Sequence, residues 1–280
     1  MTMTTTSQGG PLLRPEQVGA LLDATVGGMS IALLVSKVVQ TGSTSYRIPV
    51  LTTDSTAGWF TEGAEITPSD SVTAELDVVP PKVAGLTIIS NELAADSSPG
   101  GVQIIGDGLA RDIARKIDAA FFSIVASPAP AGLAAVALTT GTAVESAGSF
   151  TTLDAFAAAI SAAEARGATI TAFVTSPTEA LALTKLKDQT GSNRPLLGVD
   201  PTLPTKRTIY GVPLFVNPDI AAKTAWAIPS DRTYVVVREG TRVDIDRSAY
   251  FSSDRTGVRG VMRVGFGFPD PLSIIKITHA

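Results

Sequence analysis

The sequence predicts an α+β fold, because a long helix, a mixed module and a terminal run of strands follow one another along its 280 residues. Apolar residues recur at three- and four-residue steps over residues 99–127, which is typical of a helix with one buried face. Before that helix, the polar segment 53–82 separates two strand-like runs. A loop of that length inside a compact domain usually carries function.

The N-terminal region is predicted to be an arm that ends in a strand. Residues 1–14 are rich in Thr, Ser and Gly and lack the basic start of a signal peptide. Residues 15–25 favour a short helix, with a proline at its first turn and a glycine pair beyond its end. Residues 46–51, YRIPVL, indicate a short strand, and the proline restricts it to a sheet edge or a strand end.

The segment 53–82 is predicted to project as a two-armed loop, since strand-like residues precede and follow it. Arms of about twelve residues at about 3.3 Å each reach roughly 40 Å. The loop contains one aromatic pair, Trp59 and Phe60. Residues 83–90 then read as an apolar strand that leads to the long helix.

The long helix is predicted over residues 99–127, and two prolines just beyond it end the pattern. Glycines at its start weaken the first turns. The other face of the helix is expected to be charged, and Asp118 is assigned to it. The buried face is expected to contain Val102, Ile105, Leu109, Ile113, Ile117, Ala120 and Ile124.

The next region alternates helices, strands and turn-rich loops, which indicates a compact mixed α/β module. Ser176 is expected to cap one of its helices, with a proline following at the first turn. The expected helices are 152–166 and 177–187, the expected strands are 169–175, 212–217 and 224–228, and the expected loops are 129–149 and 189–204.

The C-terminal section is predicted to be mostly strand, because alternating apolar runs are separated by turn residues. Turns are expected at Glu239-Gly240, Asp254-Arg255 and the Pro-Asp-Pro that begins at Pro269. The expected strands are 234–237, 241–246, 257–267 and 272–277.

Composition limits the function classes. Hydrophobic residues make up 44%, charged residues 17%, and mean hydropathy is +0.27, which fits either an alanine-rich globular protein or a subunit covered by neighbours. A net charge of −4 and the lack of a basic stripe argue against specific nucleic-acid binding. The chain has no cysteine, which excludes disulfides and thiolate chemistry. The apolar run 26–39 is too short and interrupted to span a bilayer, so no membrane contact is expected.

Catalytic motifs are scarce in the sequence. His279 is the only histidine, and its place near the C-terminus predicts a frayed or solvent-facing side chain rather than a catalytic one. Asp244 and Asp246 share one strand face and could in principle act as a catalytic pair or bind a metal. Arg242 and Arg247 beside them favour an arginine-paired or solvated face instead. We therefore expect no enzyme activity, no cofactor and no metal.

Four elements, in this order, resemble the major capsid proteins of tailed phages, which share the Hong Kong 97 fold. They are YRIPVL, GWFTEGAEI, KVAGLTIISNEL and AYFSSDRTGVRGVMRVGFGFPDPLSIIKI. The Trp-x-x-Glu-Gly and Ser-x-Glu-Leu elements are the most specific of these. The resemblance extends over nearly the whole chain from about residue 30.

This resemblance implies a Hong Kong 97-like capsid fold with an N-terminal arm, an extended loop (the E-loop), a peripheral domain with a long spine helix, and an axial mixed α/β domain. The implied bounds are 1–52 for the arm and entry strand, 53–82 for the E-loop, 83–130 with 236–269 for the peripheral domain, and 131–235 with 270–280 for the axial domain.

The resemblance also implies a function. The chain would be a structural protein that self-assembles as pentamers and hexamers into an icosahedral head around double-stranded DNA, which it binds without sequence specificity. Portal and separate scaffolding proteins would be its partners. It would be found in the virion, after assembly in the host cytoplasm. An encapsulin-like shell that encloses cargo enzymes is the alternative with the same fold.

Charge suggests how subunits meet. Residues 54–81 carry a net charge of −6 and no basic residue, whereas residues 232–263 carry seven arginines and a net charge of +3. We expect the loop of one subunit to lie on the arginine-bearing surface of the next, a head-to-tail contact that closes into rings. Alternatively, these charges only solubilise the chain. The expected interface residues are Trp59, Phe60, Glu62, Glu65, Asp70, Glu75, Asp77, Arg242, Arg247, Arg255, Arg259 and Arg263.

The loop sequence predicts particles without covalent crosslinks. Some members of the family join an E-loop lysine to an asparagine of a neighbour, but residues 54–81 contain no lysine and Lys82 lies at the base of the loop. Boiled particles should therefore run as one monomer band on a denaturing gel. A ladder of heavier bands would refute this prediction.

Overall fold

The computed structural model describes most of the chain. The described residues are 26, 28–92, 100–136, 143–146, 150–189, 191–197, 207–246 and 248–279. The expected arm over 1–14, the expected helix over 15–25 and Arg247 lie outside these residues, as do the side chains of the first turns of the long helix. Among the described helices, none is long and apolar enough to cross a membrane.

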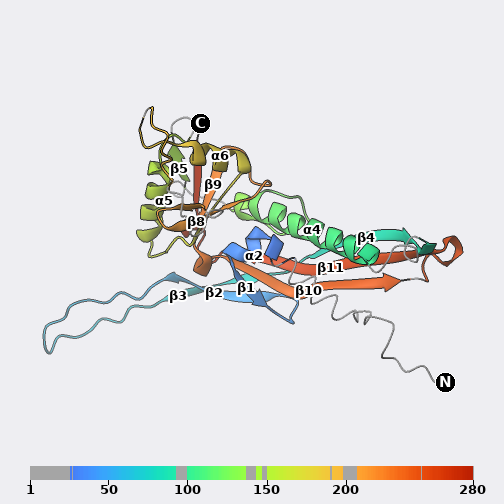
Figure 1. Ribbon diagram of the computed structural model, residues 1–280. Coiled ribbons are helices and arrows are strands. Elements are labelled where there is room, and N and C mark those ends of the chain that lie inside the picture. The colour runs from blue at the N-terminus through green and yellow to red at the C-terminus, as the bar shows by residue number, and fades with distance from the viewer. Residues whose placement is uncertain are drawn as a thin grey trace, which may run out of the picture.

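A four-stranded sheet forms the elongated half of the molecule (Figure 1). Its antiparallel strands β10 (Tyr234–Asp246), β11 (Arg255–Gly267) and β4 (Lys82–Ser90) pair in that order, and β1 (Lys37–Gln40) pairs parallel to β10. The helix α4 (Gly100–Phe122) lies along one face of this sheet. The sheet therefore has one covered face and one face turned away from α4.

Small residues on the sheet allow α4 to approach closely. A Cβ at Gly260 would lie 2.7 Å from Leu109 Cδ2, and one at Gly85 would also collide with Leu109. Gly260 and Gly85 are direct cross-strand partners, so both lie under the same helical turn. Ile113 and Ile117 complete the buried stripe of the helix, as the periodicity predicts.

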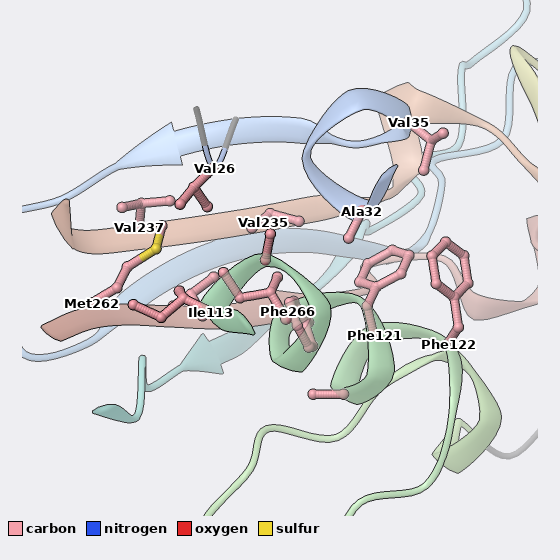
Figure 2. Packing of buried hydrophobic residues seen from close by; sticks show 14 of the residues in the cluster. Val26, Ala32, Val35, Ile113, Phe121, Phe122, Val235, Val237, Met262 and Phe266 are labelled. Atoms are coloured by element: carbon pink, nitrogen blue, oxygen red, sulfur yellow. The ribbon is translucent and has the colours of Figure 1, made fainter. Parts of the chain in front are cut away.

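The end of α4 differs from the sequence-based expectation. The helix ends at Phe122 rather than at residue 127, and Ile124 is 73% exposed instead of buried. Phe121 and Phe122 fill the last buried turn, and Phe121 contacts Phe266 edge-on with ring centroids 5.0 Å apart (Figure 2). Gly132 lies against the carbonyls of Ala120 and Phe121, where a Cβ would collide with both.

A six-stranded mixed sheet forms the second half of the molecule. Helix α5 (Asp154–Glu164) packs on one face, where Phe156 meets Phe173 at 5.1 Å between ring centroids. Val174 and Trp226 point from the other face into the cluster that contains Phe121, so the two halves share a continuous core. The strand order is β5 (Ala143–Ser146), β12 (Ile275–His279), β9 (Thr224–Ile228), β6 (Ala172–Thr175), β8 (Val212–Val216) and β7 (Arg207–Ile209).

A two-stranded ribbon, β2 (Tyr46–Thr53) and β3 (Val72–Val78), projects from the body in Figure 1. Its base is anchored by Ile48 and Val78, which pack against Val236 of β10. The segment 54–71 joins the two strands, and we call it the projecting loop. Strand β3 thus lies within the segment 53–82 that the sequence predicts to be loop.

Several expected elements are confirmed and others are wrong. Helix α6 (Pro177–Lys185) begins where predicted, with the Ser176 hydroxyl accepting a hydrogen bond from the Glu179 backbone N–H at 3.4 Å. The turn expected at Glu239-Gly240 is instead an irregularity inside the continuous strand β10, because β11 pairs with β10 on both sides of it. The short strands β1, β5 and β7 have no clear signal in the sequence.

The close approach of α4 generates a stability prediction. Gly260→Val should destabilise the unassembled subunit by about 1–3 kcal/mol, because the added side chain meets Leu109 and Ile113. Urea unfolding of the variant and the parent would measure this. Gly42→Val is the matched control, since a Cβ there has no atom within 4 Å, and an equal loss of stability in both variants would contradict the prediction.

Candidate functional site

The projecting loop exposes all of its side chains to solvent. Trp59 is fully exposed, and Phe60 and Ile66 are 45% and 69% exposed. A turn with Gly63 at φ +82 forms the tip, and the Thr56 backbone N–H donates to Ser69 Oγ across the loop at 2.9 Å. Large apolar side chains held away from the body in this way require a partner surface to be buried.

The loop and the ribbon that carries it are acidic, as the sequence predicts, and one acid of the ribbon forms an ion pair within the subunit. Glu75 lies on β3 and meets Arg47 of β2 at 3.4 Å, and both side chains are largely exposed. Among the described residues, Glu62, Glu65 and Asp70 form no ion pair. The part of the chain that the structure describes therefore leaves the negative charge of the outer loop unneutralised.

The expected arginine surface is an ordered network, which we call the arginine ladder: Glu239, Arg242, Asp244, Arg259 and Arg263. Arg242 donates two hydrogen bonds to the Asp244 carboxylate, at 2.9 and 3.0 Å, and Arg259 donates a third at 2.7 Å. Glu239 lies 3.6 Å from Arg242 and 3.5 Å from Arg263. Most of the ladder charge is therefore balanced within the subunit.

The hydrogen bonds around Asp244 and Asp246 favour the charged form of both carboxylates. Hydrogen bonds from Arg242 and then Arg259 lower the pKa of Asp244, which confirms the arginine-paired interpretation for that residue. Hydrogen bonds from the side chain and backbone of Ser248 lower the pKa of Asp246. Both carboxylates are thus held in their charged form, which does not suit a proton-exchanging catalytic pair.

An apolar strip lies next to the ladder on the face turned away from α4. Leu86 is the cross-strand partner of Arg259, and Ile88 is the partner of Gly257. Direct partners share a sheet face, so Leu86 and Ile88 lie beside the ladder, 59% and 42% exposed. At its other end, the same face is covered by the ribbon of the same subunit, where Val78 packs over Gly265.

A buried carboxylate joins three distant segments, and its expected place on the charged outer face of the helix is wrong. Asp118 is 5% exposed and accepts from Ser30 Oγ at 2.7 Å, from two backbone N–H groups of α2 (Ile31–Val35), and from Asn217 Nδ2 at 2.8 Å. Burial raises the pKa of Asp118, while the hydrogen bonds oppose that shift. Ser30 ahead of an apolar run is the one sequence signal of this arrangement.

His279 is also placed differently from the expectation. Its side chain is 7% exposed, and its Nε2 lies 3.0 Å from Glu179 Oε2. Its ring makes a T-shaped contact with Phe150, with 4.7 Å between the ring centroids. The cause is β12, which pairs with both β5 and β9 as far as its last residues. Its described partners hold the strand end in place, so the side chain is neither frayed nor solvent-facing.

Metal ligands do not gather in the described part of the chain. No group of three or more His, Cys, Asp or Glu side chains with metal-binding geometry occurs there. The features with unusual exposure are instead the projecting loop and the open face beside the ladder. The candidate functional site is therefore a pair of surfaces rather than a cavity with reactive groups.

Comparisons with known proteins agree with this architecture. The family model described as the phage capsid family matches residues 9–279. No curated protein matches the sequence. Similar solved structures come from Microbacterium phage Oxtober96, at 19% identity and TM-score 0.75 over 100% of this chain and 96% of that one, and from Mycobacterium phage Adephagia, at 18% and 0.74 over 90% of each chain. A chain from the capsid of an empty GTA particle matches at 21% identity and TM-score 0.73, over 100% of this chain and 95% of that one.

The buried joint predicts a large stability loss on truncation. Asp118→Ala should destabilise the unassembled subunit by on the order of 3 kcal/mol, because it leaves four donors without their acceptor. Urea unfolding would measure the loss. The control is Asp112→Ala, an exposed aspartate on the same helix that should change stability by less than about 0.5 kcal/mol. Equal stability of the Asp118 variant and the parent would contradict the proposed role of the joint.

Proposed function

The chain belongs to the phage capsid family, and on that premise we propose that it is the shell-forming major capsid protein of a tailed phage. Many copies assemble as pentamers and hexamers into an icosahedral head that encloses double-stranded DNA. The observation that carries this proposal is the projecting loop, whose exposed Trp59 and unpaired acids have no partner surface among the described residues of their own subunit.

The parts of the fold receive family roles in this proposal. The ribbon β2–β3 with the projecting loop is the E-loop, and α4 is the spine helix of the peripheral domain built on the four-stranded sheet. The six-stranded sheet with α5 and α6 is the axial domain, whose tips meet around the symmetry axes. Support comes from the shared fold of the compared capsid chains, with TM-scores of 0.73 to 0.75.

The contact between subunits places the loop of one copy on the ladder face of the next. The loop contributes acids and exposed apolar side chains, and the receiving face contributes Leu86, Ile88 and the arginines of the ladder. Because exposed ion pairs are worth only about 0.2–1 kcal/mol each, the charges set register rather than affinity. Apolar contacts repeated around every subunit stabilise the shell by multivalency.

The ladder also explains how charges could fix the position of the loop on the neighbouring subunit. Its arginines are held in fixed positions by Asp244 and Glu239, so they meet an incoming carboxylate without losing much side-chain freedom. Arg255, at the start of β11, is exposed, and among the described residues it forms no ion pair. It is therefore the arginine of this face with the most unbalanced charge toward a neighbour's loop.

The remaining partners follow from the capsid role. A portal and a separate scaffolding protein would take part in assembly in the host cytoplasm, and the finished protein would be in the virion. DNA would be packed against the shell without sequence-specific contacts, consistent with a net charge of −4.

Cryo-electron microscopy of the purified protein tests the proposal. Closed shells, or rings of five and six copies, are the expected result, and DNA inside shells from infected cells would distinguish a phage head from a compartment filled with cargo enzymes. A protein that remains monomeric even with the scaffolding protein of the same phage would overturn the proposal.

Charge reversal of the loop tests the subunit contact. The triple variant Glu62→Lys, Glu65→Lys, Asp70→Lys should remain a folded subunit but form no shells, because its new positive charges would then face basic residues of the neighbouring subunit. Light scattering follows assembly, and circular dichroism checks the fold. The matched control neutralises the same three positions with Gln, Gln and Asn and should still assemble. Normal shells from the reversed variant would rule out this contact.

A further inference from the structure

A groove of about 360 Å³ lies between α4, the start of β4 and the segment that follows α4. Its floor is apolar and includes Ile117, Val264 and Phe266. An apolar cavity of about 150 Å³ is large enough to bind benzene, so this groove has room for an indole ring. Val125, on its outer wall, is 42% exposed, so the groove is open at the surface.

The rim of the groove carries positive charge that the described residues do not balance. Lys82 and Lys116 line the groove together with Asp112. Among the described residues, neither lysine forms an ion pair or a hydrogen bond through its side chain. This differs from the arginine ladder, where Asp244 and Glu239 already neutralise much of the charge.

The groove and the ladder face meet at the edge of the sheet. β4 is the edge strand, and Lys82 at its start is the cross-strand partner of Arg263. Lys82 therefore belongs to the ladder face and also lines the groove. A chain segment that crosses the ladder face toward β4 reaches the groove by passing over this one strand.

The tip of the projecting loop has the complementary chemistry. Trp59 is fully exposed, Phe60 follows it, and Glu62 and Glu65 come next in the sequence. One arm of the loop, about nine residues at about 3.3 Å each, reaches roughly 30 Å, whereas four strands spaced by about 4.8 Å are roughly 15 Å across. The arm is thus long enough to cross the sheet and pass its edge.

We propose that the loop tip of one subunit crosses the ladder face of its neighbour, passes over the edge of β4 and inserts Trp59 into this groove, with Glu62 and Glu65 beside Lys82 and Lys116. The occupant is a second copy of the chain, because the ribbon carries the loop away from α4 of its own subunit (Figure 1). The inference rests on the proposed function and specifies where the subunit contact ends.

Engineered cysteine pairs test the position of the tip, since the chain has no cysteine of its own. Glu62→Cys is combined with Lys116→Cys at the groove in one variant and with Arg259→Cys on the ladder in another. Oxidised particles of the groove pair should give covalent oligomers of up to six copies on a non-reducing gel, and the ladder pair should stay monomeric.

The outcomes separate this inference from the proposed function. Crosslinking of the ladder pair alone would overturn the inference but leave the subunit contact in place. Intact shells without crosslinking of either pair would overturn the inference and the contact, while the capsid role would stand. Failure of the cysteine-free parent to form shells, with or without scaffold, would count against the capsid role itself.

Blocking the groove provides an independent test. Ala126→Phe adds a ring from an exposed position on the groove wall, whereas Ile124→Phe adds the same ring just outside it. The first variant should lower shell yield about tenfold, the effect of losing one interface anchor, and the second should not. Normal yield from the blocked variant would contradict the proposal.

Tryptophan fluorescence gives a readout that does not depend on yield. Trp226 is 1% exposed in the subunit, so a change in iodide quenching on assembly reports Trp59. Quenching should fall several-fold when the parent assembles. Unchanged quenching in complete shells would show that Trp59 stays in solvent and would overturn the insertion.

Discussion

The carboxylate of Asp118 is the constraint on which the arrangement of the two halves depends. It is fixed on the spine-like helix α4, and it receives donors from the start of α2 and from Asn217, which follows β8 of the six-stranded sheet. An unpaired charge at this depth would be costly, so the three segments are stable only together. Phe121, one turn farther along α4, then packs in the same cluster as Trp226. A single polar joint thus sets the position of the shared core.

The ribbon and the arginine ladder are both held in place by contacts within the subunit. The ribbon is anchored by Ile48 and Val78 and carries the projecting loop beyond either sheet. The ladder pairs the arginines of the open face within the subunit, so in the proposed contact they would already be positioned before a neighbour binds. Because each exposed ion pair contributes little, the strength of such a contact depends on apolar side chains and on repetition around the subunit. In the proposed contact, affinity and register would therefore come from different residues.

The sequence predicts well those helices and strands that depend on local residue patterns. The periodicity of α4, the cap at Ser176 and the alternation of the terminal strands need few distant contacts to be recognised. The acidic, aromatic-bearing loop is also visible from composition. The expected outward positions of Asp118 and His279 are wrong, because their partners, Ser30 and Glu179, are distant in sequence. Likewise, the continuity of β10 through Gly240 depends on β11, which no local turn signal reports.

The central place of β12 has a consequence for the order of synthesis. Residues 275–279 lie between β5 and β9, so the six-stranded sheet has no continuous hydrogen-bonded ladder until this last strand has left the ribosome. Nascent chains that have exposed their projecting loop but not β12 therefore lack a finished second half. A chain that lacks residues 275–279 would therefore leave β5 and β9 unpaired along the edges that β12 joins.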